Sequence, residues 1–341
     1  MKPVALVTGE VSPYRREPFR MLDEAEGVEA LAWRETGQLQ AARAVASGRH
    51  RAVIAGLGGR VALPAVYAAA RRAGIPFVLW ASIWEHPRTA AHTLSKPLTQ
   101  ALYRSADAVV TYGPHVSAHV RRHRRTGNVF EAPQAVSAEH FGRPVSAQER
   151  DDWRRSAGLH APDGGFLALF VGRLEEEKGV RILLTAWRDA GLGGAALALA
   201  GDGPMRADAS GLGTLLGHVD SDRLPALYAA ADVLVLPSIR TATFTEPWGL
   251  VVNEAMHQGT PAITTDAVGA AAGGLVRHGH NGLVVPQRDP AALAGALRTL
   301  AGDPALRERL GAAAREDVAG FSEAAWVAGM RQALTSVGAA R

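Results

Sequence analysis

The stretch Glu246-Pro-Trp-Gly-Leu-Val-Val-Asn-Glu254 places two carboxylates eight positions apart around the start of a predicted helix. Pro247 and Gly249 indicate a turn, and the apolar residues that follow recur at helical spacing until Gly259 ends the pattern. We therefore expect Glu246 in the loop before the helix and Glu254 inside it. A helix N-terminus attracts anions, so a ligand with a phosphate there would offer sugar hydroxyls to one carboxylate and a ribose to the other.

A second anion-binding pattern lies upstream. The apolar run from Phe166 to Val171 is typical of a buried strand, and the segment Gly172-Arg173-Leu-Glu-Glu-Glu-Lys178-Gly179 follows it before another predicted helix. Arg173 can bind phosphate oxygens with its forked guanidinium, and Lys178 can act as a point charge. A structural ion pair with the intervening glutamates is the competing interpretation, but the strand–loop–helix context favours phosphate.

Four motifs together resemble the pattern of glycosyltransferase family 4. In chain order they are the Arg173–Lys178 loop, Ala200-Gly-Asp-Gly-Pro204, Leu224-Pro-Ala-Leu-Tyr-Ala-Ala-Ala-Asp232-Val-Leu-Val-Leu-Pro237-Ser238 and the Glu246–Glu254 segment. The resemblance covers residues 166–300 and weakens toward both ends of the chain. It implies a retaining, nucleotide-sugar-dependent enzyme with the α/β GT-B fold, in which two Rossmann-like β/α/β domains face each other across a cleft.

The resemblance also implies roles for individual residues. Arg173 and Lys178 would neutralise the departing diphosphate in place of a metal ion, Glu246 would bind the donor sugar, and Glu254 would bind the ribose. No metal ligands and no cofactor are expected, because the nucleoside diphosphate sugar is itself the substrate. The remaining predicted donor-binding residues are Gly9, Gly172, Gly201, Gly203, His218, Val219, Pro247, Trp248, Gly249, Leu250 and Val251.

Two loops of the N-terminal half are further candidates. The loop from Thr8 to Arg15 follows the first predicted strand, and Gly9 there is either a donor-facing residue or part of an ordinary βα turn. The segment from Trp80 to His86 follows the fourth predicted strand, and its aromatic side chains suit sugar binding. The resemblance implies a histidine near this place that contacts donor or acceptor. His86 is therefore a candidate catalytic residue, with an ordinary loop histidine as the alternative.

Two runs of alternating strands and helices predict two parallel sheets. We place the boundary near Gly142-Arg-Pro144, which gives a domain of residues 1–143 for the acceptor side and one of residues 144–320 for the donor. A last helix within residues 321–341 is expected to return to the first domain. The predicted strands are Val4–Val7, Val28–Trp33, Ala52–Ala55, Phe77–Trp80, Ala108–Thr111, Asn128–Glu131, Phe166–Val171, Ala196–Ala200, Val233–Leu236, Ala262–Thr264 and Leu283–Val285.

Composition limits the class of protein. The chain has 341 residues, 47% of them hydrophobic, no cysteine and a formal net charge of +4. The missing cysteines exclude disulfides and thiolate chemistry. The first residues read as a strand rather than a signal peptide, and no apolar run reaches about 18 residues, so we expect a cytoplasmic protein. The basic run Arg121–Arg125 leaves open a weak peripheral contact with the inner face of a membrane, against a solvated helix end.

The resemblance, together with these patterns, implies a retaining glycosyltransferase that moves a sugar from a nucleoside diphosphate sugar to a hydroxyl group. The acceptor class stays open among glycans, lipid-linked molecules and small molecules, and no nucleic acid is expected as a partner. Two alternatives remain. One is another GT-B enzyme, either a nucleotide-sugar epimerase or a glycosyl phosphorylase, and the other is a non-catalytic subunit that binds sugar nucleotides. The two carboxylates combined with Arg173 and Lys178 argue against the non-catalytic alternative.

Overall fold

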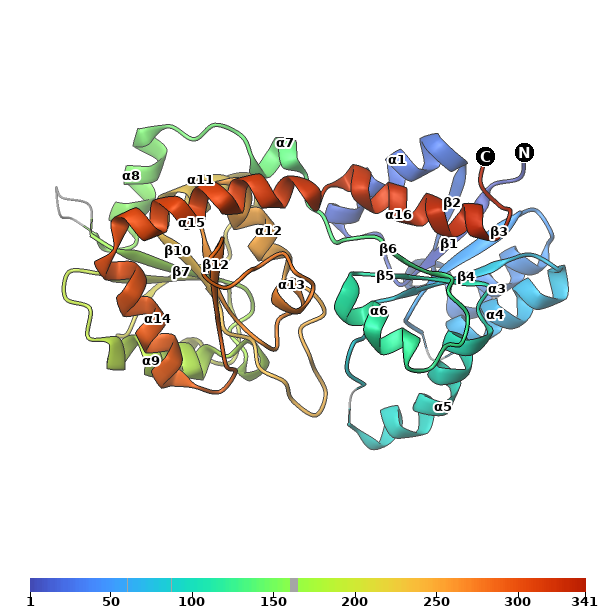
Figure 1. Ribbon diagram of the computed structural model, residues 1–341, viewed down its shortest axis with the longest axis horizontal. Helices are drawn as coiled ribbons and strands as arrows, with labels where there is room; N and C mark the ends of the chain where they lie inside the picture. The colour runs from blue at the N-terminus through green and yellow to red at the C-terminus, as the bar shows by residue number, and fades with distance from the viewer. Residues whose placement is uncertain (60, 87, 160–164) are drawn as a thin grey trace. The chain divides into compact units, whose positions relative to one another are not determined.

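The protein is described by a computed structural model that covers residues 1–59, 61–86, 88–159 and 165–341. The chain forms two α/β units, here called unit 1 (Met1–Ala135 with Ser322–Arg341) and unit 2 (Val136–Phe321). Each unit contains one six-stranded parallel sheet (Figure 1). The sequence analysis placed the boundary eight residues later, after residue 143. The Gly-Pro signal used there follows a short helix, Ala138–Phe141, that already packs against helices of unit 2.

The sheet of unit 1 has the strand order β2-β1-β3-β4-β5-β6. The chain passes from β1 to β2 at one edge and then returns to β3 on the other side of β1. The order therefore reverses between β1 and β3, and ligands of open α/β sheets bind at the carboxyl ends of the strands at such a switch point. The strands are β1 (Val4–Thr8), β2 (Val28–Ala32), β3 (Ala52–Gly56), β4 (Phe77–Ala81), β5 (Ala108–Thr111) and β6 (Val129–Glu131).

Helices cover the sheet of unit 1, and the C-terminal helix is one of them. Helix α16 packs beside α1, and Trp326 of α16 contacts Phe19 of α1 and Trp80 of β4, with ring centroids 5.7 and 5.5 Å away. Helix α3 packs beside α4 (Figure 1). The helices are α1 (Arg16–Glu26), α2 (Trp33–Thr36), α3 (Gln38–Ala46), α4 (Ala62–Ala73), α5 (Ala90–Ser105), α6 (Pro114–Arg121) and α16 (Glu323–Ser336).

The sheet of unit 2 has the strand order β12-β11-β10-β7-β8-β9. The order reverses between β7 and β10, so this sheet too has a switch point at its centre. The sequence analysis missed β9, a half-exposed edge strand of only four residues that ends in a glycine. The strands are β7 (Leu167–Val171), β8 (Ala196–Ala200), β9 (Thr214–Gly217), β10 (Val233–Leu236), β11 (Ala262–Thr265) and β12 (Gly282–Val285).

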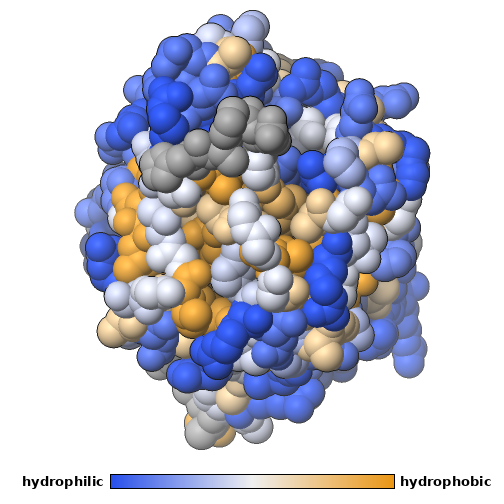
Figure 2. Space-filling model, turned by 90° about the vertical axis from the view of Figure 1, so that its left-hand side faces the viewer, coloured by the Kyte–Doolittle hydropathy of each residue, from blue (hydrophilic) through white to orange (hydrophobic). Residues whose placement is uncertain are grey.

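The core of unit 2 lies between the sheet and its helices. Strand residues such as Phe170 and Val235 pack with Leu183 of α9 and Leu297 of α14, all of them fully buried. Helices α9 and α14 lie side by side. The face of unit 2 in Figure 2 has apolar residues across its middle and hydrophilic residues around them. The helices are α7 (Ala138–Phe141), α8 (Ala147–Ser156), α9 (Val180–Ala190), α10 (Arg206–Ala209), α11 (Leu224–Ala230), α12 (Leu250–His257), α13 (Gly269–Ala272), α14 (Pro290–Gly302) and α15 (Pro304–Asp317).

Helix length also bears on membrane association. Within the described ranges, none of the helices combines the length and the apolar character that a membrane crossing requires.

Candidate functional site

The loop after β7 is held against the end of β10. A short 3-10 turn from Glu176 to Lys178 leads into Gly179, which has a φ of 73° and precedes α9. A Cβ atom at Gly179 would lie only 1.9 Å from the carbonyl oxygen of Pro237, the first residue after β10. Only glycine allows this approach and this left-handed conformation. The contact therefore places Lys178 at the switch point between β7 and β10.

Two other predicted glycines have a structural reason as well. A Cβ at Gly201 would lie 1.9 Å from the carbonyl oxygen of Gly172, and one at Gly203 would lie 2.5 Å from that of Leu174. The loop after β8 thus packs backbone to backbone against the loop after β7, which carries Arg173. Because the two backbones leave no room for a side chain, this packing is enough to account for glycine at positions 201 and 203. Both loops nevertheless lie at the same end of the sheet.

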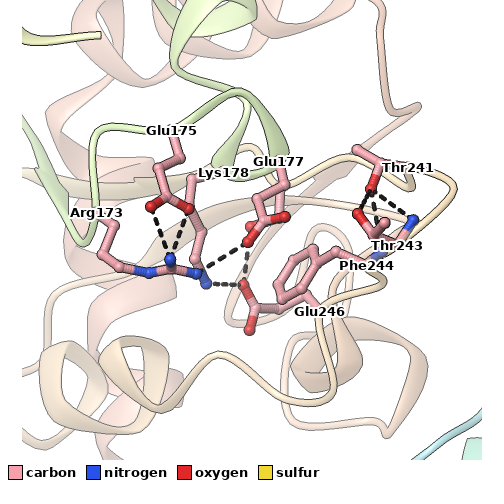
Figure 3. A network of polar contacts seen from close by, with 9 residues as sticks. Arg173, Glu175, Glu177, Lys178, Thr241, Thr243, Phe244 and Glu246 are labelled. Atoms are coloured by element: carbon pink, nitrogen blue, oxygen red, sulfur yellow. Dashed lines mark hydrogen bonds and ion pairs between the residues drawn. The ribbon is translucent and has the colours of Figure 1, made fainter. Parts of the chain in front are cut away.

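Lys178 forms an ion pair with Glu246, the residue that opens the second predicted motif (Figure 3). Lys178 Nζ lies 2.5 Å from Glu246 Oε2, and the side chains are 16% and 8% exposed. Ser238 Oγ donates a hydrogen bond to the same carboxylate oxygen at 3.0 Å. The ring of Phe244 lies 5.0 Å from Lys178 Nζ. A buried cation, a buried carboxylate and an aromatic face therefore meet after the carboxyl ends of β7 and β10.

Arg173 lies in the same network but has different partners (Figure 3). Its guanidinium contacts Glu175 at 2.7 Å and Glu177 at 2.9 Å, and its side chain is 60% exposed. These are the pairs with the intervening glutamates that were expected as the alternative to a phosphate role. Exposed pairs of this kind contribute only about 0.2–1 kcal/mol, so they leave Arg173 able to turn toward an anion.

The turn before α12 is tightly fixed. Gly249 has a φ of 96°, and a Cβ there would lie 2.6 Å from Leu236 Cδ2. The buried indole of Trp248 donates from Nε1 to Asn253 Oδ1 at 2.7 Å, so this side chain supports the turn from inside. The main chain of Glu246 accepts a hydrogen bond from Gly269 N at 3.1 Å. Pro247, Leu250 and Val251 are half-buried around this turn.

Glu254 lies within α12, as expected, and is bonded to Tyr228 of α11. The Tyr228 hydroxyl donates to Glu254 Oε2 at 2.5 Å. Burial raises the pKa of Glu254 to about 7, and the hydrogen bond from Tyr228 offsets part of that rise. The two carboxylates of the motif thus have different surroundings, because Glu246 is paired with a cation and Glu254 with a neutral hydroxyl.

The other predicted residues are more dispersed. His218 is exposed beside Asp220, and Val219 is buried. Gly9 and His86 belong to unit 1, where His86 lies half-buried in the loop after β4. The sequence analysis did not identify Ser238, Tyr228 or Phe244. Ser238 and Tyr228 belong to the segment Leu224–Ser238. Their hydrogen-bond partners, Glu246 and Glu254, belong to a different motif.

Clustered histidines and carboxylates would indicate a metal site. In residues 1–59, 61–86, 88–159 and 165–341, no three or more of the side chains that bind metal ions gather in one place. His280, one of two neighbouring histidines in a turn, pairs with Asp317 at 3.0 Å. His278 makes contacts with the main chain of Val284 instead. Both histidines of this turn thus make local structural contacts.

Known proteins resemble this chain in sequence. Residues 151–317 match the family model described as "Glycosyl transferases group 1". An uncharacterized glycosyltransferase of Methanocaldococcus jannaschii is 32% identical over 209 residues, which are 56% of this chain and 51% of that protein. The chain therefore spans about half the length of this relative.

Solved structures resemble it in fold. A sucrose-phosphate synthase from Thermosynechococcus elongatus has a TM-score of 0.77 at 22% identity, covering 99% of this chain and 100% of that one. HepE from Anabaena, solved in complex with UDP, has a TM-score of 0.76 at 20% identity, covering 98% and 100%. The chain thus has the two-unit α/β architecture of the GT-B fold, and its residues 151–317 match the group 1 glycosyl transferases.

Proposed function

We propose that the protein is a retaining glycosyltransferase that moves a sugar from a nucleoside diphosphate sugar to a hydroxyl group. The observation that carries this proposal is the buried pair of Lys178 and Glu246 at the switch point of unit 2. It joins the two sequence motifs at the place where open α/β sheets bind ligands. The match of residues 151–317 to glycosyl transferases supports the same reaction class.

Arg173 and Lys178 are proposed to bind the diphosphate. When the bond between sugar and diphosphate breaks, negative charge builds on the leaving group, and fixed cations stabilise it. Arg173 would exchange its exposed pairs with glutamates for phosphate oxygens. Lys178 would keep Glu246 beside it and add the phosphate as a second partner, since an ammonium group has three donors. The two cations would make a divalent metal unnecessary.

The carboxylates are proposed to bind the two sugars of the donor. Glu246, next to Lys178, would accept hydrogen bonds from hydroxyls of the transferred sugar. Glu254, inside α12, would accept them from the ribose. The main-chain N–H groups at the start of α12, from Trp248 to Val251, would face the phosphates, because the first N–H groups of a helix have no partners within it.

Unit 1 is proposed to bind the acceptor. His86 lies in the loop after β4, and Gly9 lies in the loop after β1, at the carboxyl end of that sheet. His86 would contact the donor sugar or the acceptor. The acceptor would be a glycan, a lipid-linked molecule or a small molecule with a free hydroxyl. We propose a cytoplasmic location, with peripheral contact to the inner face of a membrane as an open alternative.

A turnover assay tests this function. The protein is incubated with a panel of nucleoside diphosphate sugars and acceptors, and release of nucleoside diphosphate is followed together with the anomeric configuration of the product. We expect transfer with retention, and the same rate in EDTA as with added Mg²⁺ or Mn²⁺. Activity that disappears in EDTA and returns with the metal would refute the role given to the two cations. Epimerised donor without acceptor would identify a nucleotide-sugar epimerase instead.

A further inference from the structure

Unit 1 contains a cavity at the switch point of its own sheet. Its volume is about 250 Å³, and it lies after the carboxyl ends of β1, β3, β4 and β5. Ligands of open α/β sheets bind at this position. The residues that matter most in its lining are Gly9, Arg15, Trp33, Gly58, Trp80 and Tyr112.

Arg15 brings a positive charge into this cavity, and its contacts are with uncharged groups. Its guanidinium donates to the Tyr112 hydroxyl at 2.9 Å and to Thr8 Oγ1 at 3.4 Å, and it lies 4.5 Å from the ring centroid of Trp80. In the part of the chain that the structure describes, its Nε is buried with no hydrogen-bond partner. The Arg15 side chain as a whole is half-buried, and a charge that is partly removed from water without a counter-charge favours an anionic ligand.

The other charged groups of the cavity compensate each other. Glu10 Oε2 accepts a hydrogen bond from Arg34 Nη1 at 3.0 Å, and both side chains are more than half exposed. Both residues line the cavity. The counter-charge of Glu10 is therefore Arg34 and not Arg15. With Glu10, Arg15 and Arg34 in its lining, the cavity carries one net positive charge.

Aromatic rings shape the walls of the cavity. Trp33 lies so close to the glycines of two loops that a Cβ at Gly9 would be 3.3 Å from its Cζ2 atom and one at Gly58 would be 3.5 Å away. Trp80 and Tyr112 form the wall around Arg15, with ring centroids 5.9 Å apart. Flat apolar walls with hydroxyl groups such as those of Ser12 and Ser82 between them suit a ring that carries hydroxyls.

We propose that this cavity binds an acceptor that carries a phosphate or a carboxylate on a sugar or polyol ring, with Arg15 as the group that binds the anion. That the ligand is an acceptor rests on the proposed function, whereas the anion site itself does not. A forked guanidinium suits both kinds of oxyanion. The competing interpretation is that Arg15 only joins the loop after β1 to Tyr112, and it predicts no preference for charged ligands.

Three probes with the same ring test the charge requirement on the full chain. Glucose 6-phosphate, glucuronate and glucose carry a phosphate, a carboxylate and no charge, and calorimetry measures their binding. We expect at least one charged probe to bind about tenfold or more tightly than glucose, because a hydrogen bond to a charged group is lost with glucose. The tighter of the two charged probes identifies the anion. Equal affinities for all three, or no binding of a charged probe at millimolar concentrations, would overturn the proposal.

Variants then test the residue. Arg15→Gln removes the charge and should abolish the preference, whereas Arg15→Lys should retain part of it. Arg16→Gln is the matched control, because it removes the same charge from the exposed neighbouring residue, and it should bind like the wild type. Thermal unfolding shows whether each variant is folded. A folded Arg15→Gln variant that still prefers charged probes would contradict the proposal. If Arg15→Gln does not fold, the proposal would be contradicted by an Arg16→Gln variant that loses the preference for charged probes.

Nucleotide binding separates this inference from the proposed function. Affinity for nucleoside diphosphates is measured on the same samples and should be equal in the wild type and in Arg15→Gln, because the side chains proposed to bind the nucleotide, those of Arg173, Lys178 and Glu254, all belong to unit 2. If no nucleotide binds while charged probes still require Arg15, the proposed function fails and the anion site stands. If the protein binds nucleotide and transfers sugar to neutral acceptors, and Arg15→Gln changes neither, the proposed function stands and only the proposal of an anionic acceptor is refuted.

Discussion

Lys178 and Glu246 form an ion pair that is largely buried, and this determines what their substitution does. The sequence motifs name both residues, but they stand 68 positions apart, and their pairing depends on β7 and β10 becoming neighbours at the switch point. A local pattern contains no information about that neighbour. The bond between Tyr228 and Glu254 escaped prediction for the same reason, since helices α11 and α12 meet only through packing.

Removal of each proposed phosphate-binding cation should reduce transfer. We expect Arg173→Ala and Lys178→Ala each to lower kcat/KM by about tenfold to a hundredfold, the value of a hydrogen bond to a charged group. Lys178→Ala should also destabilise the fold by about 3–5 kcal/mol, because Glu246 is left buried without its cation. Arg173→Ala should change stability by less than about 1 kcal/mol, since its pairs are exposed. Initial rates and urea unfolding measure the two effects.

Arg181→Ala is the matched control for these variants. Arg181 follows the same loop, is 62% exposed and pairs with Glu176 and Asp208, yet it has no place in the proposed site. Its kcat/KM should equal that of the wild type. Near-normal kinetics in Arg173→Ala or Lys178→Ala would reassign the substituted residue to a purely structural ion pair.

The raised pKa of Glu254 makes ribose binding sensitive to pH. The free carboxyl has a pKa of about 7, and the ionised form is the stronger hydrogen-bond acceptor for ribose hydroxyls. We therefore expect the affinity for a nucleoside diphosphate sugar to fall as the pH drops below about 7. Glu254→Gln should bind the nucleotide more weakly, with less dependence on pH. Tyr228→Phe should move the transition to higher pH, because it removes the bond that favours the ionised carboxylate.

Glu246→Gln provides the comparison for Glu254→Gln. It should leave the affinity for free nucleoside diphosphate nearly intact and depress transfer, because its proposed contact is with the donated sugar. Calorimetry with the nucleotide alone and initial rates with the full donor separate the two effects. Equal loss of nucleotide affinity in both variants would show that the two carboxylates act as one structural unit.

At the scale of elements, the sequence patterns were sufficient wherever a strand or helix carries its own signal. Helix α9 runs from Val180 to Ala190 between Gly179 and Gly191, and both glycines are left-handed. The edge strand β9 was missed because four half-exposed residues show no lasting alternation. The close backbone approach at Gly179 was also invisible, since it depends on Pro237 in a distant segment. The periodicity of apolar residues indicates which face of a segment is buried. Contacts between loops depend on the order of the strands in the sheet, which no single segment encodes.

The two glycines that flank α9 should tolerate alanine differently. Gly191 has a φ of 62° and no atom within 4 Å of the place that a Cβ would occupy, whereas Gly179 has a φ of 73° and the Pro237 oxygen at 1.9 Å. Gly191→Ala should cost about 1–2 kcal/mol for the left-handed conformation alone. Gly179→Ala should cost about 2–5 kcal/mol, because overpacking adds to that strain. Urea unfolding measures both, and equal costs would show that the loop relaxes without resistance.

At the scale of the whole molecule, unit 1 is assembled from both ends of the chain. Glu26, the last residue of α1, is fully buried, and its carboxylate joins three segments. It accepts hydrogen bonds from Arg51 Nη2 at 2.9 Å, from Arg331 Nε at 2.7 Å and from the Arg341 main chain at 2.7 Å. The sequence analysis expected the last helix to return to the first domain, but it identified no residue that binds the helix there. A single glutamate at the end of a helix belongs to no sequence pattern that would predict its burial or its partners.

Glu26→Gln should therefore loosen the C-terminal segment from the rest of unit 1. Burial opposes ionisation of Glu26, but hydrogen bonds from Arg331 and Arg341 and the charges of Arg331 and Arg51 outweigh it and lower the pKa. We expect a loss of about 3–5 kcal/mol at neutral pH, because the largely buried Arg51 and the half-exposed Arg331 lose the buried counter-charge that they share. Since the folded pKa lies below the unfolded one, the stabilisation is complete above the unfolded pKa and disappears as the pH falls through the folded value. The difference between variant and wild type should therefore shrink in acid.

Glu17→Gln is the control for that comparison, because Glu17 lies on the same helix in an exposed pair with Arg20. It should cost less than about 1 kcal/mol. Urea unfolding at several pH values measures both variants, and calorimetry measures nucleoside diphosphate affinity, which should be unchanged because the side chains proposed to bind the nucleotide belong to unit 2. A Glu26→Gln variant as stable as Glu17→Gln would mean that the apolar packing of Trp326 against Phe19 and Trp80 holds the C-terminal helix without help from the carboxylate.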